Sequence, residues 1–515
     1  MAALSKDKAS LFWLPLGTLL FLLIDGGRGW PEGGQDSWNH YLYGRWAFIH
    51  PELFLDQWGK PLYTLLISLP AQLGFHAVLY FNMACTLITG WLMYRFALRL
   101  QWRHPWLAYP LTWFTPVLFG NTVSALTEPL NGLMVALVLF FFASERKTAA
   151  LLIASLLPLV RSEGYVIIAA IACYLLLSRG WRHIPLLAGG TLLLAAAGWL
   201  DSGDPLWIIH SNPYLRFDAE TRWHPGSGAF FHYLHQQRLI TGTAGLVLAL
   251  GGWMAALIIF SEALPGGSRL RAMLNGIRKQ HTPTDPTNNE RDQVKLVFLL
   301  CGGITAAYFL AHSYLWWSGS MGSHGLLRVF AVIVPCFVAA QHFLLHLLGA
   351  LPKMDKIMPP LLIAGSALLG WNAYHTAGYA APWNFHKASI PAPPQASTVE
   401  KSMEWLQERK LNNRVLVHQL PFFNMMYELD HWEKPEQAKT YYIWSIDWRD
   451  NFKRDWMPIG SIVLYDGYHA GRDGFLPMDS IMNCSHYQLL HHESYRDDVG
   501  KPNPQFDVWL FEKTR

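Results

Sequence analysis

The chain has 515 residues, of which 52% are hydrophobic and 15% are charged, and its formal net charge is +4. This composition is too apolar for a disordered chain. The small positive charge lies mostly in short loops, so it bears on membrane orientation and does not indicate nucleic-acid binding. Long apolar runs alternate with short charged segments up to about residue 372, which predicts an integral membrane protein.

A membrane-spanning helix needs about 20 mostly apolar residues. The first apolar run follows Lys6 and Lys8 and is not followed by an A-x-A-like cleavage site, so we interpret it as an uncleaved first helix. The sequence predicts about eleven spans in total, at residues 10–24, 77–98, 105–120, 127–143, 148–160, 164–178, 184–200, 239–261, 294–312, 325–349 and 357–373.

The distribution of basic residues predicts the orientation of these spans. With the N-terminus in the cytoplasm, every predicted inner loop is basic, as the positive-inside rule requires. The outer loops carry acidic and aromatic residues and few Lys or Arg, and an odd number of spans places residues 374–515 on the extracytoplasmic side. The run from Leu62 to Gly74 is too short to span, and we interpret it as a helix at the outer membrane surface.

Beyond the spans, residues 374–396 form a predicted linker and residues 397–515 a small soluble domain. Ser397 to Lys410 has helical character, with a capping box from Ser397 to Glu400. Strands are predicted at Val415–His418, Ser461–Tyr465 and Phe506–Phe511. The expected fold is therefore mostly α: a transmembrane helix bundle at residues 1–373 with a small extracytoplasmic α/β domain.

Two long outer segments, 25–61 and 201–238, contain most of the outer polar residues. In the first, Asp36 and Asp56 are carboxylates that can act as a general base or as metal ligands. Lys60 can hold a phosphate leaving group. The alternative is that these are ordinary loop residues, with Asp36 capping a short helix.

Glu128, Arg161 and Glu163 lie at the ends of apolar runs. Glu128 begins the run after Thr127, where a carboxylate is costly unless it is paired or faces a cavity, although an N-terminal capping role also fits. Arg161 and Glu163 lie between two short runs, where they can pair with each other. Arg161 is also suited to a lipid phosphate.

In the second long segment His232 is expected to be structural more often than catalytic. Arg328 begins the tenth predicted span, where it either extends to the interface or binds phosphate. His342 and His346 share a helix face but make only a weak metal signal. The five cysteines show no disulfide or zinc pattern, and no nucleotide-binding motif is present.

Several elements in order resemble the GT-C superfamily of polytopic glycosyltransferases, which use polyprenyl- or dolichyl-phosphate sugars. They are an early acidic residue in the first outer loop, a Trp-x-Lys-Pro-Leu-Tyr element, a Thr-Glu-Pro-Leu element, an Arg-x-Glu-Gly element and a large outer loop with a soluble C-terminal domain, here at Asp36, Trp58–Tyr63, Thr127–Leu130, Arg161–Gly164 and Gly203–Tyr233. Many members carry paired acidic residues in the first loop, whereas Ser37 follows Asp36 here.

The resemblance implies an inverting, mannosyltransferase-like transfer from a polyprenyl-phosphate sugar to a glycan, lipid or protein acceptor at the extracytoplasmic face. The short Ala-rich and Leu-rich spans suit a bacterial inner membrane. Asp36 would be the catalytic base. Lys60, Arg161 and Arg328 would bind the donor phosphate. Asp56, Glu128, Glu163 and His232 would support them, and the need for a divalent cation (Mg or Mn) is open.

Three alternatives remain at this point. An O-antigen polymerase or ligase type of enzyme would use outer Arg and His residues and no first-loop carboxylate. A lipid or sugar transporter would place charges near the bilayer midplane and show inverted repeats. A non-catalytic assembly protein would use the soluble tail to bind partners.

Overall fold

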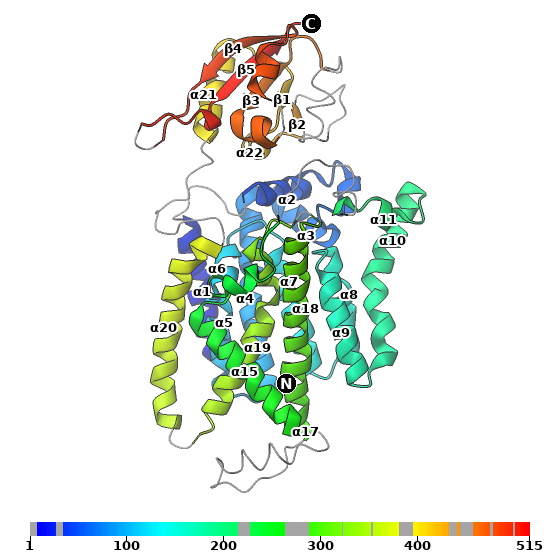
Figure 1. Ribbon diagram of the computed structural model, residues 1–515, viewed down its shortest axis with the longest axis vertical. Helices are drawn as coiled ribbons and strands as arrows, with labels where there is room; N and C mark the ends of the chain where they lie inside the picture. Colours follow the sequence, from blue (N-terminus) through cyan, green and yellow to red (C-terminus); the bar gives the residue numbers. More distant parts are fainter. Residues whose placement is uncertain are drawn as a thin grey trace. The chain divides into compact units, whose positions relative to one another are not determined.

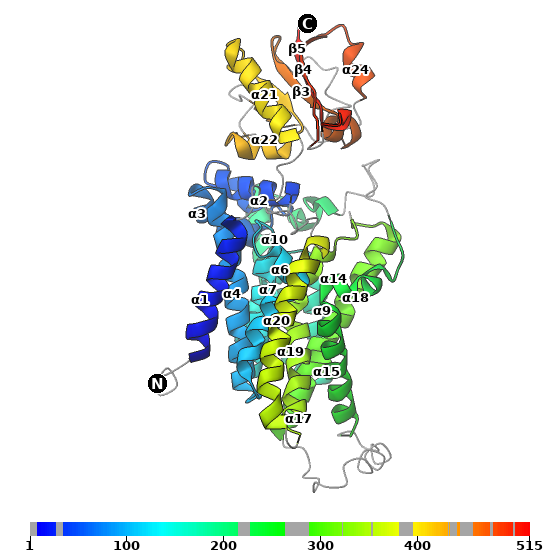
Figure 2. The same cartoon turned by 90° about the vertical axis from the view of Figure 1, so that its left-hand side faces the viewer.

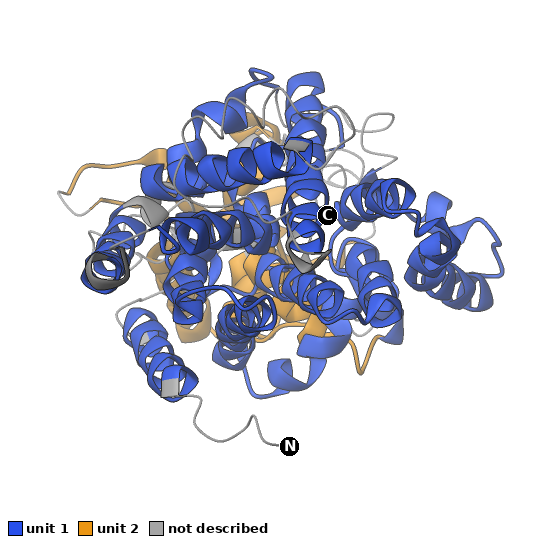
Figure 3. Cartoon of the chain, turned by 90° about the horizontal axis from the view of Figure 1, so that it is seen from below, with its two compact units in different colours: residues 1–27, 51–388 blue, residues 28–50, 389–515 orange. Residues whose placement is uncertain are grey.

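A computed structural model describes residues 8–26, 34–214, 227–262, 288–321, 323–351, 354–380, 395–430, 432, 440–442, 457–473, 477–497 and 500–515. The chain divides into two compact units (Figure 3). Unit 1 comprises residues 1–27 and 51–388, and unit 2 comprises residues 28–50 and 389–515. This division differs from the predicted one, because residues 28–50 of the first outer loop group with the C-terminal residues and the predicted linker at 374–396 is divided between the two units after residue 388.

The regular secondary structure in the described part of unit 1 is helical. Its α-helices are α1 (Lys8–Gly26), α3 (Pro61–Gln72), α4 (Phe75–Arg99), α5 (Ala108–Trp113), α6 (Pro116–Asn121), α7 (Glu128–Ala143), α8 (Lys147–Ser155), α9 (Gly164–Leu177), α10 (Gly189–Ser202), α11 (Trp207–His210), α13 (His232–His235), α14 (Gln237–Ile240), α15 (Thr243–Glu262), α17 (Asn288–Lys295), α18 (Gly303–Ser318), α19 (Val334–Leu348) and α20 (Met354–Ala380). Short 3-10 helices are η1 (Pro51–Phe54), η2 (Pro105–Leu107), η3 (Leu157–Leu159), η4 (Trp181–Ala188) and η6 (Leu327–Ile333), and η5 (Leu296–Gly302) is a π-helix.

The longer helices of unit 1 run side by side as a bundle (Figures 1 and 2). Among the described residues, five helical segments are long and apolar enough to cross a membrane: Phe75–Arg99, Trp181–Ser202, Thr243–Ser261, Arg291–Ser318 and Leu327–Leu348. Four shorter apolar helices lie at Ala9–Asp25, Glu128–Ala143, Lys147–Leu159 and Gly164–Leu177. These findings support an integral membrane protein, but the predicted count of eleven spans is not confirmed.

The predicted span at 105–120 is broken into η2, α5 and α6. Thr115 has extended backbone angles and precedes Pro116, which begins α6. A residue before proline is pushed away from the helical region, and proline itself cannot donate a backbone hydrogen bond. Continuous apolar sequence therefore does not make one continuous helix here.

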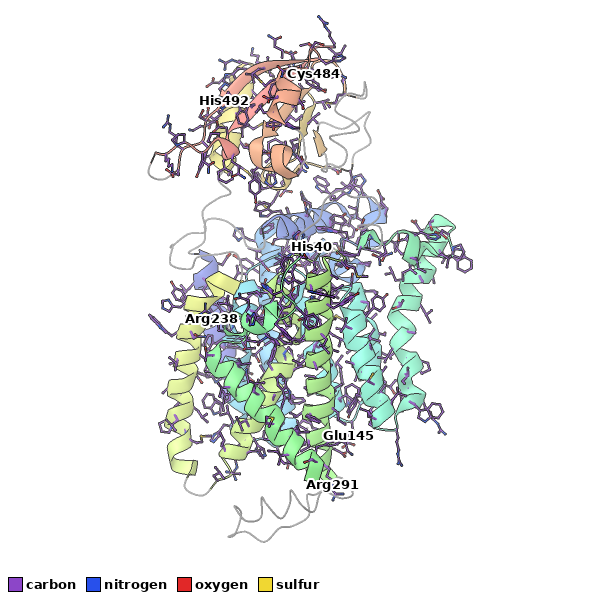
Figure 4. All side chains as sticks on the ribbon, in the orientation of Figure 1. His40, Glu145, Arg238, Arg291, Cys484 and His492 are labelled. Atoms are coloured by element: carbon purple, nitrogen blue, oxygen red, sulfur yellow. The ribbon has the colours of Figure 1, made fainter. Side chains whose placement is uncertain are left out.

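Loops predicted to be cytoplasmic meet at one end of the bundle. The Arg103 backbone N–H donates to His346 Nδ1 at 3.1 Å, and Trp102 Nε1 donates to Gln293 Oε1 at 2.9 Å. Glu145 and Arg291 lie near this same end of unit 1 (Figure 4). This grouping agrees with the predicted loop pattern, while the direction of the bundle across a membrane stays a prediction.

The helix predicted at Leu62 to Gly74 is observed as α3. It buries Tyr63 and Ile67 against the bundle and exposes Leu65, Leu69 and Leu73. One face of α3 is therefore available to lipid, which suits an interfacial helix.

Unit 2 contains a five-stranded sheet of order β2-β1-β3-β5-β4. The strands are β1 (Leu416–His418), β2 (Thr440–Tyr442), β3 (Ile462–Asp466), β4 (Tyr487–Glu493) and β5 (Val508–Lys513). β1 pairs in parallel with β2 and β3, and β5 pairs antiparallel with β3 and β4. In β3 all five residues are buried, which places this strand in the core of the unit.

The helices of unit 2 are α2 (Gly34–Trp46), α21 (Gln395–Glu408), α22 (Pro421–Met426) and α24 (Met478–Met482), with a π-helix η7 (Gly467–Asp473) and a 3-10 helix η8 (Pro504–Phe506). The three predicted strands and the predicted helix are confirmed. The predicted capping box is wrong, because α21 begins at Gln395 and Ser397 already lies in its first turn. Thr398 instead donates its hydroxyl to the Phe506 carbonyl at 3.1 Å.

Candidate functional site

Lys60 is held at the start of α3 in unit 1. Asp56 Oδ1 accepts from the Gly59 backbone N–H at 2.7 Å, which tightens the turn before Lys60. Lys60 itself has a left-handed backbone (φ 67°), and Pro61 begins the helix. Asp56 therefore shapes the turn that carries Lys60, and its supporting role in a reaction stays a prediction.

The ammonium group of Lys60 is turned inward, and the residue is only 6% exposed. Its Nζ donates to Gln57 O at 3.0 Å, to Ser162 Oγ at 3.2 Å and to Tyr214 OH at 2.9 Å. It also lies 4.4 Å from the centre of the Tyr214 ring. These partners are all neutral, so they solvate the positive charge without cancelling it.

Glu128 begins α7 and has no exposed surface. Its Oε1 lies 2.7 Å from Arg161 Nη1 and 3.3 Å from Arg328 Nε. Two guanidinium groups from distant parts of the chain thus meet on one buried carboxylate. Pairing of this kind is what makes a charge tolerable at such a depth.

Arg161 also binds two further groups. Its Nη1 donates to Thr127 Oγ1 at 2.8 Å and its Nη2 donates to Glu163 Oε1 at 2.7 Å. The turn that carries Arg161 packs closely on its neighbours, since a Cβ on Gly164 would lie 2.5 Å from the Leu157 backbone. The glycine of the Arg-x-Glu-Gly element is therefore required by this close approach.

Lys60, Glu128, Arg161, Glu163 and Arg328 form what we call the charged cluster. Ser162, whose hydroxyl accepts from Lys60, joins the lysine to the turn that carries Arg161 and Glu163. The side chains of the two arginines are each 13% exposed and that of Glu163 is 20% exposed. Three cations and two carboxylates leave a formal charge of +1 (3 − 2) in a largely desolvated place, which favours an anionic ligand.

The structure adds His312 of α18, which the sequence analysis did not single out. It is 5% exposed, and its ring centre is 4.5 Å from that of Tyr308. Its Nε2 has no hydrogen-bond partner among the described residues, and its charge would interact with Glu163 and Arg161. An ionisable residue inside an apolar span was the signal that could have found it.

His232 has a structural contact. Its Nε2 lies 3.0 Å from the carbonyl oxygen of Gly325, and its ring packs against Trp316. Gly325 has a left-handed φ of +66° and lies in the loop that leads to Arg328. The contact with its carbonyl oxygen means that His232 supports this loop. His224, another histidine of the segment 201–238, lies outside the described residues.

The histidine pair on α19 is explained by packing. His342 Nε2 lies 3.1 Å from the Arg103 carbonyl, and His346 Nδ1 accepts from the Arg103 N–H. In the part of the chain that the structure describes, no group of three or more His, Cys, Asp or Glu side chains is placed to hold a metal ion.

Asp36 lies in the first turn of α2 and is partly buried. It belongs to unit 2, whereas the charged cluster belongs to unit 1. The structure thus brings together five of the predicted site residues: Lys60, Arg161, Arg328, Glu128 and Glu163. The predicted base, Asp36, belongs to the other compact unit.

No family model matches the chain, and no curated protein matches it. Among solved structures, the chain is similar to the cryo-EM structure of arabinofuranosyltransferase AftD from Mycobacteria, with a TM-score of 0.45 and 14% sequence identity. The similarity covers 98% of this chain and 40% of that chain, so this chain spans about two fifths of the length of that enzyme.

Proposed function

We propose that the chain is a membrane glycosyltransferase that transfers a sugar, with inversion, from a polyprenyl-phosphate donor to an acceptor at the extracytoplasmic face of a bacterial inner membrane. The observation that supports this proposal most directly is the charged cluster. It combines a net positive charge, low exposure and three cationic side chains from separate parts of a bundle with apolar helices.

Sugar transfer from a phosphate donor requires cationic side chains near the phosphate. When an acceptor hydroxyl attacks the anomeric carbon, the bond between that carbon and the phosphate oxygen breaks, and the phosphate keeps the electron pair. Negative charge grows on the phosphate, so cations fixed beforehand in a desolvated place stabilise the transition state. In this proposal Lys60, Arg161 and Arg328 contact the phosphate, while Glu128 and Glu163 keep the arginines oriented.

The acceptor proton requires a base, and Asp36 is the proposed one. Its carboxylate would accept the proton from the attacking hydroxyl, which typically contributes a factor of about 10²–10⁴ to the rate. The acceptor is a glycan, a lipid or a protein with a free hydroxyl. The requirement for Mg²⁺ or Mn²⁺ is decided by assay arms with EDTA and with each cation.

The test is donor consumption by the full-length protein in nanodiscs, with a panel of polyprenyl-phosphate sugars and membrane extract as the source of acceptor. We expect turnover of one donor, which Asp36→Asn lowers by about a hundredfold or more. Glu52→Gln, a change in η1 of unit 1, is the control and leaves turnover intact. Consumption of no donor, with extract present, would sink the proposal.

One observation favours a second candidate, a polymerase or ligase type of glycosyl transferase. The charged cluster lies within unit 1 together with the buried His312, and arginine with histidine is what such an enzyme is expected to use. Asp36→Asn separates the two candidates. Under the second, this variant keeps full turnover, whereas His312→Ala and Arg161→Ala abolish it.

A further inference from the structure

Helix α2, which carries Asp36, packs on α22 inside unit 2. Trp38 meets Phe422 with ring centres 5.7 Å apart, and Tyr43 meets Trp432 at 5.0 Å, both pairs edge to face. The two partners come from opposite ends of the chain. A segment of the first outer loop is therefore folded into the C-terminal unit and buries aromatic surface there.

Glu428, two residues beyond α22, holds α2 with both carboxylate oxygens. Its Oε1 accepts from Tyr41 OH at 2.5 Å, and its Oε2 accepts from Arg45 Nε at 2.9 Å. Tyr41 and Arg45 are four residues apart, so they lie on one face of α2. Burial and the nearby Glu428 raise the pKa of Tyr41, which keeps its hydroxyl protonated and donating.

The backbone at Glu428 is unusual for a residue with a side chain. Its φ is +49°, in the left-handed region that favours glycine. The adjoining turn is fixed by the Leu429 N–H, which donates to the Asn424 carbonyl at 2.9 Å. Glu428 keeps this strained backbone while both of its carboxylate oxygens accept hydrogen bonds from α2. The free energy of these contacts therefore outweighs the cost of the left-handed backbone.

A second ion pair fixes the end of the same segment. His50 Nε2 lies 2.7 Å from Asp430 Oδ2, and the other oxygen of Asp430 accepts from the Trp432 N–H at 3.0 Å. The chain leaves unit 1 after residue 27 and returns at residue 51. Residues 28–50 are thus joined covalently to unit 1 at both ends, and they make the contacts described above with residues 422–432 of unit 2.

We propose that the C-terminal unit is the support that fixes the first outer loop, and that Glu428 is a positioning residue that acts on Asp36 through Tyr41 and Arg45. The catalytic part of this inference rests on the proposed function, because it takes Asp36 as the base. The structural part does not.

Hydrogen exchange of residues 36–46 tests the structural part in the full-length protein in nanodiscs. We expect Glu428→Ala to speed amide exchange in α2 by about tenfold or more, because the helix loses two anchors. Glu512→Gln is the matched control, since it alters the Arg414–Glu512 ion pair of the same unit. Unchanged exchange in Glu428→Ala would overturn the inference.

Reversing the charges of residues 45 and 428 distinguishes a specific contact between them from a general loss of stability. Glu428→Arg alone should loosen α2, and the double variant Arg45→Glu with Glu428→Arg should restore part of the protection. If the double variant exchanges as fast as the single one, the contact between residues 45 and 428 is not what fixes the helix.

Donor kinetics test the catalytic part. Glu428→Ala should lower kcat about tenfold or more and leave KM for the donor nearly unchanged, because the proposed phosphate contacts belong to unit 1. A loosened α2 with an unchanged kcat would overturn the positioning role. If the wild type consumes no donor, the proposed function and the catalytic part fail together, and the exchange result still decides whether the C-terminal unit fixes α2.

Discussion

Arg161 Nη1 lies 2.7 Å from Glu128 Oε1, and this carboxylate has no exposed surface. Arg328 reaches the same oxygen from the start of η6 at 3.3 Å. Neither arginine extends away to the interface, since each side chain is only 13% exposed. The two ion pairs connect α7, the turn before α9 and η6 through one buried carboxylate. The charged cluster therefore stabilises the bundle and is also a candidate anion site.

Replacement of Glu128 by Gln should destabilise the protein strongly. It leaves two buried guanidinium groups without their shared carboxylate, and breaking a buried ion pair typically costs about 3–5 kcal/mol. Thermal unfolding in detergent measures the loss. Glu163→Gln is the comparison, because Glu163 is partly exposed and, among the described residues, pairs with one arginine. Equal unfolding temperatures for the two variants would contradict this assignment.

Arg161→Lys should lower the rate of donor turnover, while the positive charge at this position is kept. The guanidinium divides its two terminal nitrogens between Thr127 Oγ1 and Glu163 Oε1, and a lysine cannot reproduce this fork. We expect kcat/KM for the donor to fall about tenfold to a hundredfold. Arg99→Lys, at the exposed end of α4, should retain wild-type kinetics. Full activity of Arg161→Lys would show that the fork does not matter for the reaction.

Gly252→Ala should separate α15 from α19. A Cβ at this position would lie 1.9 Å from the carbonyl oxygen of Ala340, which is backbone and cannot move aside cheaply. Small residues allow such close helix contacts in membrane proteins, and overpacking typically costs about 1–3 kcal/mol. Gly303→Ala in α18 is the control, because its new methyl group would have no described neighbour within 4 Å. The unfolding temperature should fall for the first variant and hold or rise for the second.

Unit 2 should lose stability as the pH falls. Burial lowers the pKa of His418 to about 3, and the neutral ring is held by Asn424 Oδ1 at 3.0 Å and the Leu420 N–H at 3.2 Å. An unfolded histidine binds a proton below about pH 6.5, so the unfolded state takes up the proton first. The stabilisation is complete above pH 6.5 and is lost as the pH falls toward 3, by about 2–3 kcal/mol at pH 4.5.

Exchange of the β1 amides, corrected for the intrinsic rate at each pH, measures this loss. His418→Gln should flatten the pH dependence between pH 6.5 and 4.5, whereas His486→Gln, at an exposed position, should leave it as in the wild type. If both variants follow the wild-type curve, the titration of His418 does not govern the unit.

The sequence predicted those features that depend on local pattern. Apolar runs located the bundle helices, and short runs with strand-like composition located β1, β3 and β5. Charged residues at the ends of apolar runs pointed to Glu128, Arg161 and Arg328, because an unpaired charge there is costly. The pairing of both arginines with Glu128 was not predicted, since it depends on tertiary contacts between residues more than 30 positions apart.

The features that local pattern did not predict depend on tertiary context. The strand β4 has a mixed exposure pattern and four polar residues among seven, so its pairing with β5 decides its conformation. The grouping of residues 28–50 with the C-terminal residues follows from Glu428 and Asp430, which are more than 370 residues away. Nothing in the composition of either segment indicates its partner.

The most direct measurement for the central claim is binding of polyprenyl phosphate, compared with the neutral polyprenol, to the full-length protein in nanodiscs. The charged cluster predicts that the phosphate lipid binds at least about tenfold more tightly than the alcohol, and that Lys60→Met removes most of this difference. Equal binding of the two lipids by the wild type, or an undiminished preference in Lys60→Met, would contradict the assignment of the cluster as the donor phosphate site.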